Sequence, residues 1–154
     1  MTLSQNNFTG EYSYSLDSKG RVNIPARYRQ VLSNDNENTF MTTRGQDACV
    51  WVYPMIEWKK IESELRKLSS VSGTHRTFIR QISRSASPST YDKQGRIKIN
   101  PSLISYAGLE KEVLIVGVVK KIEIWNPEIE AEVYKKNMEL DPNEFNELST
   151  KIVI

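Results

Sequence analysis

The chain reads Asp17-Ser18-Lys19-Gly20-Arg21-Val22-Asn23-Ile24-Pro25, and a second version of this stretch follows as Asp92-Lys93-Gln94-Gly95-Arg96-Ile97-Lys98-Ile99-Asn100-Pro101. Each copy has an aspartate, then a glycine and an arginine, and then aliphatic residues at alternate positions before a proline. A polar turn that leads into an apolar strand and recurs along a chain indicates one structural unit used twice. The stretch therefore predicts two tandem repeats, each with a basic turn.

The similarity between the copies continues beyond these turns. Phe40 to Pro54 and Val113 to Pro127 each run from an apolar strand through a glycine to an alternating aromatic strand that ends at proline. A short helix fits between the turn and these strands in each copy, because proline is favoured at a helix start. Since either repeat alone is near the lower size limit for independent folding, we expect the two to share one core.

The first repeat is expected to open with a β-hairpin. Residues Glu11 to Leu16 alternate polar with aromatic or aliphatic side chains, the pattern of a half-buried strand. Asp17 to Gly20 forms a turn, because aspartate can hydrogen-bond the backbone ahead of it and glycine accepts a positive φ. Residues Arg21 to Ile24 then return as the second strand of the predicted hairpin.

The remaining helices divide the chain. Pro54 opens an amphipathic helix, Thr74 is a candidate N-cap for a helix that ends at Arg84, and Pro127 opens a charged helix. We therefore expect a first repeat with its helix, a linker with a basic helix, and a second repeat with a C-terminal helix, over residues 8–68, 69–84 and 85–154.

Bulk properties exclude several classes of protein. The 154 residues contain no apolar run near the roughly 18 residues of a membrane-spanning helix, and the N-terminus lacks the apolar segment of a signal peptide. Cys49 is the single cysteine, so no intrachain disulfide can form, which fits a reducing cytoplasm. We expect a cytoplasmic protein with no membrane partner.

The net charge of +2 is unevenly distributed along the chain. Eight Lys or Arg residues fall between Arg66 and Lys98 against one acidic residue, and eight Asp or Glu residues fall between Glu123 and Glu147 against two lysines. Such asymmetry is typical of a face that binds a polyanion or of subunits that attract each other head to tail, although two solvated helix faces also produce it.

The two turns carry the strongest candidate site. If the repeats pack about a pseudo-two-fold axis, Lys19 with Arg21 and Lys93 with Arg96 form one basic surface. Arginine can form two hydrogen bonds with guanine in the major groove, lysine can neutralise phosphate, and a β-ribbon can enter that groove. Alternatively, each arginine simply pairs with the aspartate of its own turn.

A second basic surface is expected on the helix that ends at Arg84. At helical spacing Arg76, Arg80 and Arg84 share one face, opposite an apolar side. This face suits phosphate, or it suits the acidic surface around Glu128, Glu130 and Glu132, in the same chain or a neighbouring one. Of these we favour an assembly contact with the acidic surface.

Other reactive side chains give no enzyme or cofactor site. His75 and Cys49 are single and distant, so they form no zinc site, and no nucleophile elbow or phosphate-binding loop is present. We therefore expect no catalytic residue, no metal, no cofactor and no small-molecule substrate. Four aromatic residues suit core or interface packing better than base stacking: Trp51, Tyr53, Trp58 and Trp125.

Taken together, these motifs resemble the MraZ family of bacterial transcriptional regulators, which have tandem SpoVT/AbrB-type domains. The resemblance covers roughly residues 10–127 and depends on the two D-x-x-G-R turns and their surroundings: Gly10-Glu11-Tyr12, Ile24-Pro25-Ala26-Arg27-Tyr28-Arg29, Thr43-Arg44-Gly45, Trp51-Val52-Tyr53-Pro54, Tyr106-Ala107-Gly108-Leu109 and Ile122-Glu123-Ile124-Trp125. The chain departs from the family pattern at Asn100-Pro101, where Pro-Pro is usual, and its second short helix is less charged.

The resemblance implies an α+β fold with two tandem β-α-β-β repeats of the AbrB/MazE-like swapped-hairpin kind, which form an intrachain pseudo-dimeric barrel with appended helices. It implies a regulator that assembles into a homo-oligomeric ring, associates with the nucleoid, and binds short direct repeats in double-stranded DNA at the promoter of the division and cell-wall gene cluster. The alternative function is a ring-forming structural module that binds an acidic protein partner.

The D-x-x-G-R loop is the DNA-reading element that the resemblance implies. Carried onto this sequence, it gives Arg21 and Arg96 as the principal readers. The expected DNA-binding residues are Lys19, Arg21, Lys93, Arg96, Arg27 and Lys98, and the expected turn-forming residues are Asp17, Gly20, Asp92 and Gly95.

Overall fold

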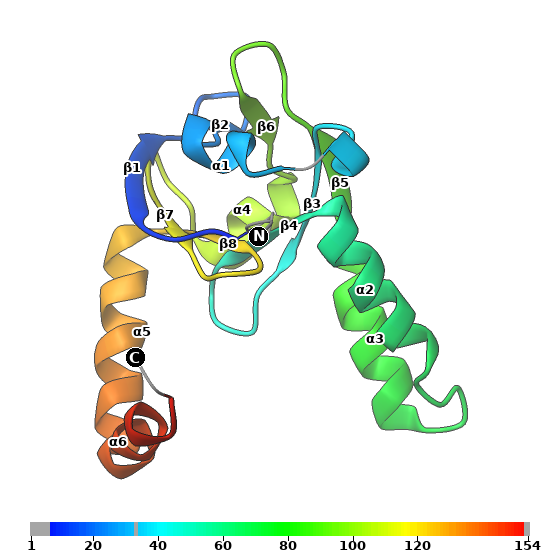
Figure 1. The fold of residues 1–154 in the computed structure, drawn as a ribbon, viewed down its shortest axis with the longest axis vertical. Helices are drawn as coiled ribbons and strands as arrows, with labels where there is room; N and C mark the ends of the chain where they lie inside the picture. Colours follow the sequence, from blue (N-terminus) through cyan, green and yellow to red (C-terminus); the bar gives the residue numbers. More distant parts are fainter. Residues whose placement is uncertain (1–6, 33, 153–154) are drawn as a thin grey trace, which may run out of the picture.

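The computed structural model describes residues 7–32 and 34–152, and Figure 1 shows their arrangement. Its elements in chain order are β1 (Glu11–Ser15), β2 (Arg21–Asn23), α1 (Ala26–Gln30), η1 (Asn34–Asn36), β3 (Thr39–Arg44), β4 (Val50–Pro54), α2 (Met55–Arg66), α3 (Gly73–Ser85), β5 (Ser87–Thr90), β6 (Arg96–Lys98), α4 (Pro101–Ala107), β7 (Glu112–Gly117), β8 (Ile122–Trp125), α5 (Pro127–Leu140) and α6 (Pro142–Lys151).

The strands are arranged so that the two repeats occupy equivalent places. A six-stranded antiparallel sheet has the order β1-β7-β8-β4-β3-β5, and β2 pairs with β6 in a separate two-stranded ribbon. Exchanging β1 with β5, β3 with β7 and β4 with β8 leaves this order unchanged. The chain is therefore a mixed α+β protein with two tandem β-α-β-β units, β2-α1-β3-β4 and β6-α4-β7-β8.

The predicted hairpin of β1 with β2 is wrong. The turn between them closes as expected, with the amide of Gly20 donating to the carbonyl of Asp17, but β1 pairs with β7 and β2 pairs with β6. Both partner strands belong to the second repeat. Both strands pack against the core that the repeats share. There the backbone edge of each strand meets a strand of the second repeat, and β1 and β2 do not pair with each other.

The expected barrel is also wrong, because the sheet does not close. β1 and β5 are its outer strands, and no described strand joins them. β2 and β6 span only Arg21–Asn23 and Arg96–Lys98, and each is paired with the other rather than with a sheet edge. The ribbon instead lies at the top of the molecule in Figure 1, at the end farthest from the long helices.

One core serves both repeats, as the sequence predicted. It contains aliphatic side chains from both copies of the opening stretch, including Val22 and Ile24 of the first and Ile97 and Ile99 of the second, each almost fully buried. Burying such side chains stabilises the fold by about 1.5–3 kcal/mol each. Because Val22 pairs directly with Ile97, the ribbon is attached to the body through the inner faces of its own strands.

Two helical arms extend from the sheet on opposite sides. The α2–α3 arm and the α5–α6 arm project in the same direction, away from the ribbon (Figure 1). The N-cap of α3 is Ser72, whose side chain accepts from the amide of His75, so the predicted N-cap at Thr74 is wrong by two residues. Among the described residues no helix is long and apolar enough to cross a membrane.

Candidate nucleic-acid interface

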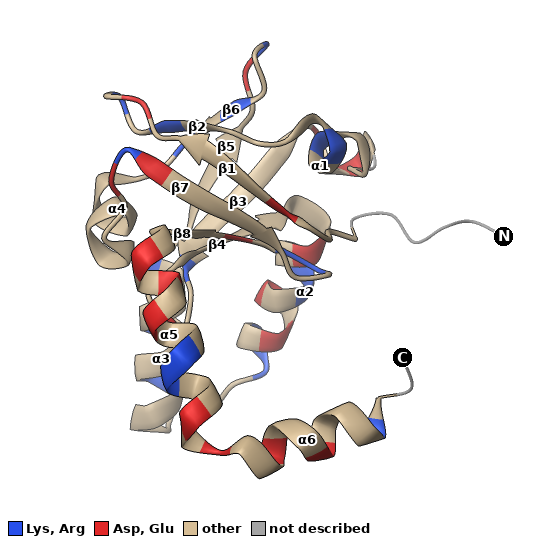
Figure 2. Ribbon diagram, turned by 90° about the vertical axis from the view of Figure 1, so that its left-hand side faces the viewer, with Lys and Arg blue, Asp and Glu red and all other residues tan. Residues whose placement is uncertain are grey.

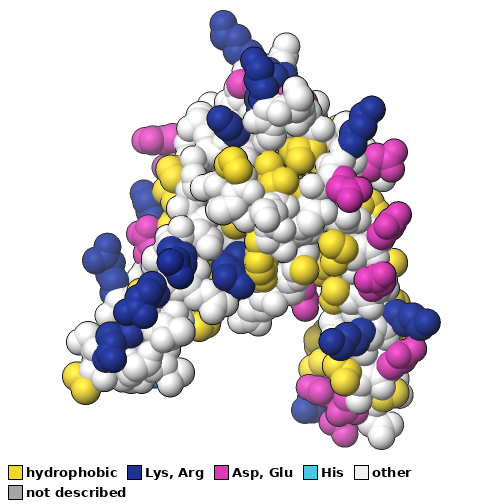
Figure 3. All heavy atoms as spheres, turned by 180° about the vertical axis from the view of Figure 1, so that it is seen from behind, with side chains coloured by type: hydrophobic (Ala, Val, Ile, Leu, Met, Phe, Trp, Pro, Cys, Tyr) yellow, Lys and Arg dark blue, Asp and Glu magenta, His cyan; other side chains and the backbone are white. Residues whose placement is uncertain are grey.

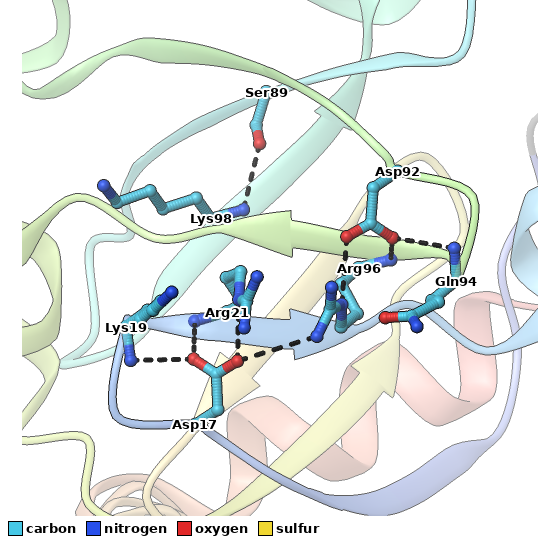
Figure 4. Close-up of polar contacts among 8 residues, drawn as sticks. All are labelled: Asp17, Lys19, Arg21, Ser89, Asp92, Gln94, Arg96 and Lys98. Carbon is cyan, nitrogen blue, oxygen red and sulfur yellow. Dashed lines mark hydrogen bonds and ion pairs between the residues drawn. The ribbon is translucent and has the colours of Figure 1, made fainter.

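The outer face of the β2–β6 ribbon is polar and basic. Antiparallel pairing places Val22 opposite Ile97, and both are buried against the core. Because side chains alternate across a strand, the flanking residues of both strands point outward. These outward residues are Arg21, Asn23, Arg96 and Lys98 (Figure 4). Two strands from different repeats therefore present their arginines on one surface.

Each basic turn is built around its aspartate. One carboxylate oxygen of Asp17 accepts from the amides of Lys19 and Arg21, at 2.9 and 2.8 Å, and the other accepts from Nε of Arg21 at 2.7 Å. Asp92 repeats this pattern with the amides of Gln94 and Arg96 and with Nε of Arg96 (Figure 4). The two turns thus have the same geometry, as their shared sequence predicts.

These hydrogen bonds favour the charged form of both aspartates. The backbone amide of Arg21 contributes most to lowering the pKa of Asp17 below its ordinary value of 3.8, and its guanidinium and the amide of Lys19 add to the effect. The pKa of Asp92 is lowered for the same reasons by Arg96 and Gln94. Both carboxylates are therefore ionised at neutral pH.

The pairing of each arginine with its own aspartate does not remove the arginine from the surface. Arg21 and Asp17 retain 33% exposure of their side chains, and the Arg96 side chain retains 26%. The contact uses Nε, so the two terminal nitrogens of each guanidinium are left for other partners. Within the described chain, Arg21 uses neither of them, whereas Arg96 Nη1 lies 3.9 Å from Asp17 Oδ2.

Asp17 consequently links the two repeats. Its Oδ2 atom contacts both guanidinium groups, from Arg21 within its own turn and from Arg96 in the opposite strand (Figure 4). No equivalent ion pair joins Asp92 to Arg21 among the described residues. The pseudo-symmetric surface is therefore asymmetric in its charges, with Arg21 less constrained than Arg96.

The other predicted DNA-binding residues surround the ribbon unevenly. Lys19 and Lys93 are exposed in the two turns, and Lys98 is exposed at the end of β6; Figure 4 shows Lys19 and Lys98. Arg27 lies on α1, where its guanidinium reaches the hydroxyl of Thr9 at 3.3 Å. The structure therefore places Lys19, Lys93 and Lys98 on the same ribbon and turns as the arginines, and gives Arg27 a partner two residues before β1.

Two residues at or beside this surface were not predicted from the sequence as site residues. Asn23 lies on the outer face opposite Arg96, and the period-two alternation from Arg21 could have identified it. Arg29 donates from Nε to the carbonyl of Ile24 at 3.1 Å and stacks over the ring of Tyr91. No local pattern marks Arg29, because it contacts the turn of the other repeat.

The glycines of both turns are required by the backbone and by close packing. Gly20 and Gly95 have φ values of 76° and 79°, in the region that disfavours other residues. A side-chain carbon at Gly95 would lie 2.5 Å from Cζ of Arg29, and one at Gly20 would lie 3.2 Å from Cδ1 of Ile104. Arg29 and Ile104 thus cover the turn of the opposite repeat, one with a charged group and the other with an apolar one.

The remaining reactive groups are used in packing. His75 accepts a hydrogen bond from the amide of Ser69, and no cluster of metal-binding side chains occurs in the described part of the chain. Cys49 is buried, and this desolvation together with Glu123 raises the pKa of its thiol. Tyr53, Trp58 and Trp125 are buried. The half-buried Trp51 donates to Glu123 and lies against the ammonium group of Lys121.

The basic helix α3 lies on one arm and the acidic helix α5 on the other (Figures 1 and 3). Arg76 donates to the carbonyls of Ser70 and Val71, which closes the loop before the helix. Among the described residues, no ion pair joins α3 to α5. The contact expected between these two charged surfaces therefore does not form within one subunit.

Comparisons with known proteins identify the same two repeats. A family described as "MraZ protein, putative antitoxin-like" matches residues 7–81 and 82–145 in two successive segments. The chain is 46% identical over 119 residues to a transcriptional regulator MraZ from Halothermothrix orenii, which covers 77% of this chain and 80% of that protein.

Two further relatives have the same name. The protein from Natranaerobius thermophilus is 46% identical over 121 residues, which are 79% of this chain and 82% of the relative. The protein from Clostridium acetobutylicum is 37% identical over 134 residues, which are 87% of this chain and 92% of the relative. Both are named transcriptional regulator MraZ.

Proposed function

Because this chain belongs to the MraZ family, we propose that it is a transcriptional regulator that binds DNA in a sequence-specific manner through the outer face of the β2–β6 ribbon. The observation that carries the proposal is the position of Arg21 and Arg96, which come from different repeats but lie on one exposed surface. Its relatives are named as transcriptional regulators, which are not enzymes.

The ribbon has the properties of an element that enters the major groove. A two-stranded β-ribbon fits the width of that groove, and arginine can form two hydrogen bonds with O6 and N7 of guanine. Each such pair contributes roughly 1–3 kcal/mol of discrimination against the wrong base. Arg21 and Arg96 are the proposed base readers, and Asn23 between them offers an amide that suits adenine.

The turn aspartates support this role by fixing the arginines. Holding each guanidinium at Nε limits its rotation and leaves the terminal nitrogens of Arg21 without a partner in the described chain, so less conformational entropy is lost when DNA binds. The carboxylates also lower the net charge of the surface, which weakens nonspecific attraction to phosphate. The arrangement therefore favours selective contacts over general affinity.

Lysines at the edge of the ribbon supply the proposed phosphate contacts. Lys19 and Lys93 at the turn tips and Lys98 at the end of β6 are exposed, and lysine acts as a point charge toward phosphate. Arg27 is a further phosphate contact in this proposal. It can leave Thr9, because a hydrogen bond of 3.3 Å at an exposed site is weak.

The resemblance extends the proposal to the target and the assembly. We infer that the protein acts in the cytoplasm at the nucleoid, on short direct repeats in the promoter of the division and cell-wall gene cluster, as a homo-oligomeric ring. Linking several subunits supports tight binding despite a net charge of only +2, because the second and later contacts form at high effective concentration.

A competition experiment tests this function. The full chain is titrated at physiological salt onto a duplex from the region upstream of its own gene, onto a scrambled duplex of equal length and composition, and onto a polyanionic control such as polyglutamate. A DNA regulator binds the upstream duplex at least tenfold tighter than the scrambled one. Equal binding to both duplexes, or stronger binding to polyglutamate, contradicts the proposal and favours the module that binds an acidic protein.

A further inference from the structure

The α5–α6 arm carries an apolar stripe that the rest of the described chain does not cover. Phe145 and Leu148 of α6, and Ile152 just after it, are 51%, 50% and 58% exposed. Their spacing places them on one helix face, and Glu144 lies along the adjacent edge next to Leu148, whereas Glu147 lies farther round the helix. Neither α5 nor α6 contains a buried residue. A helix with this pattern typically packs against a partner.

The α2–α3 arm contains an open groove with complementary properties. The groove lies between the two helices and has a volume of about 640 Å³. Its lining combines apolar side chains with three arginines and one glutamate: Leu65, Leu68 and Ile79, with Arg66, Arg76, Arg80 and Glu62. Such a groove, lined by apolar side chains and by more arginines than acidic residues, fits an amphipathic helix with an acidic edge.

The charges of the two arms favour this match. α3 contains three arginines and no acidic residue, whereas α6 contains Glu144 and Glu147 with one lysine at its end. Arg66 and Arg80 form no ion pair with any residue that the structure describes. Figure 3 shows Lys and Arg side chains along one arm, and acidic and apolar side chains together with some Lys and Arg on the other.

The α6 helix cannot occupy the groove of its own subunit in this fold. The two arms leave the sheet on opposite sides, and α6 packs against α5 (Figure 1). A second copy of the chain has the matching surfaces, because its groove can accept α6 of the first copy. Because donor and acceptor are different surfaces, such a contact is head to tail and leads to a closed ring or an open filament.

We propose that α6 of one subunit docks in the α2–α3 groove of the next, with Phe145 and Leu148 against its apolar side chains and Glu144 facing its arginines. This inference rests on the proposed assembly into a ring and identifies the surfaces that build it. The arms lie at the opposite end of the molecule from the ribbon, so that assembly leaves the DNA-contacting face open (Figures 1 and 2).

Two variants of the full chain separate the donor from the acceptor. The arm variant, Phe145→Ser with Leu148→Ser, keeps the groove but loses the apolar stripe. The groove variant, Arg66→Glu with Arg80→Glu, keeps the arm but repels its acidic edge. By light scattering coupled to size exclusion at micromolar concentration, the wild-type chain is expected as one oligomer, and each variant alone as a monomer.

Mixing the two variants gives the decisive result. The intact arm of the groove variant fits the intact groove of the arm variant, while the opposite contact is broken at both partners. An equimolar mixture is therefore expected to form a one-to-one dimer that grows no further. As a matched control, Arg84→Glu makes the same charge change on α3 outside the groove lining and is expected to leave the oligomer intact.

Several outcomes overturn the inference: a monomeric wild-type chain, a variant that keeps the wild-type mass, a mixture that stays monomeric although both variants have native circular dichroism, or an Arg84→Glu chain that dissociates. A separate titration with a duplex that holds one repeat tests DNA binding independently. Variants that are monomeric but keep wild-type affinity for this duplex have lost assembly alone, and the proposed regulator function is then unaffected.

Discussion

Asp17 closes its turn and also orients arginines from both repeats. Its carboxylate accepts from two backbone amides and from Arg21 Nε, and it lies 3.9 Å from Arg96 Nη1. A carboxylate on a DNA-facing surface lowers affinity through charge but raises it by holding the guanidinium groups in place. Because DNA readout depends on arginine geometry, we infer that the orienting effect is the larger of the two.

The change Asp17→Ala separates these two effects, because one predicts weaker binding to DNA and the other predicts tighter binding. If orientation dominates, the variant binds the upstream duplex at least about tenfold more weakly, although its net charge is one unit more positive. Fluorescence anisotropy at physiological salt measures this difference. Tighter binding by a natively folded variant would mean that Asp17 acts only as a negative charge.

The two aspartates should titrate abnormally in acid. Because hydrogen bonds from the amides and guanidinium of Arg21 and Arg96 lower the folded-state pKa of Asp17 and Asp92 below 3.8, their stabilising effect is present above that value and is lost as the pH falls through the folded-state pKa. Carbon-detected NMR titration of the carboxyl groups checks the direction. A pKa at or above 3.8 for both would contradict the turn geometry described here.

The β2–β6 ribbon shows how far sequence patterns determine an element. The repeated turn and the alternation of apolar residues predicted both strands, the short helices and the shared core. The same patterns assigned β2 to β1, because a turn between two strands normally indicates a hairpin. Pairing between repeats is decided by which surfaces the shared core brings together, and neither local periodicity nor turn chemistry contains that information.

The residues of the candidate site that belong to the repeated turn could be predicted from the sequence, and those that depend on pairing between the repeats could not. Asp17, Gly20 and Arg21 belong to one local motif that returns in the second repeat, so the turn-forming and arginine positions followed from sequence alone. Asn23 joins the surface only through its position opposite Arg96, and Arg29 only through its contact with Gly95. Both require the tertiary pairing of repeats.

The second turn should be especially sensitive to an added side chain. In Gly95→Ala, the methyl group meets the guanidinium of Arg29, and the positive φ alone costs about 1–2 kcal/mol. We expect the free energy of unfolding to fall by at least this amount in urea denaturation. Gly73→Ala is the control, since Gly73 begins α3 without a positive φ, and it should leave stability unchanged or raised. Equal effects of the two changes would contradict this account of the turn.

At the scale of the whole molecule, charge and shape separate two tasks. The basic ribbon occupies one end, and both helical arms extend from the other (Figure 2). In the function proposed above, a subunit contacts DNA with one end while the arms contact neighbouring subunits. This separation predicts that changes in the arms alter assembly, whereas changes in the ribbon alter the affinity of each subunit for DNA.

Salt dependence should report the lysines at the ribbon edge. Each phosphate contact contributes close to one counterion, so removing it lowers the magnitude of the slope of log K against log salt by about 1. For Lys19→Ala with Lys93→Ala, we expect a decrease of about 2 per bound subunit on a one-repeat duplex. Lys59→Ala with Lys60→Ala, on α2, is the control and should leave the slope unchanged. An unchanged slope in the ribbon variant would place the phosphate contacts elsewhere.

The most direct test of the regulator is the affinity of Arg21→Ala and Arg96→Ala for the duplex upstream of the gene, measured by anisotropy beside circular dichroism. Loss of either guanidinium is predicted to weaken binding about 10- to 100-fold and to abolish the preference over scrambled DNA, with the fold unchanged. If both variants keep native spectra and bind the upstream duplex as tightly as the wild-type chain, the ribbon is not the surface that reads DNA.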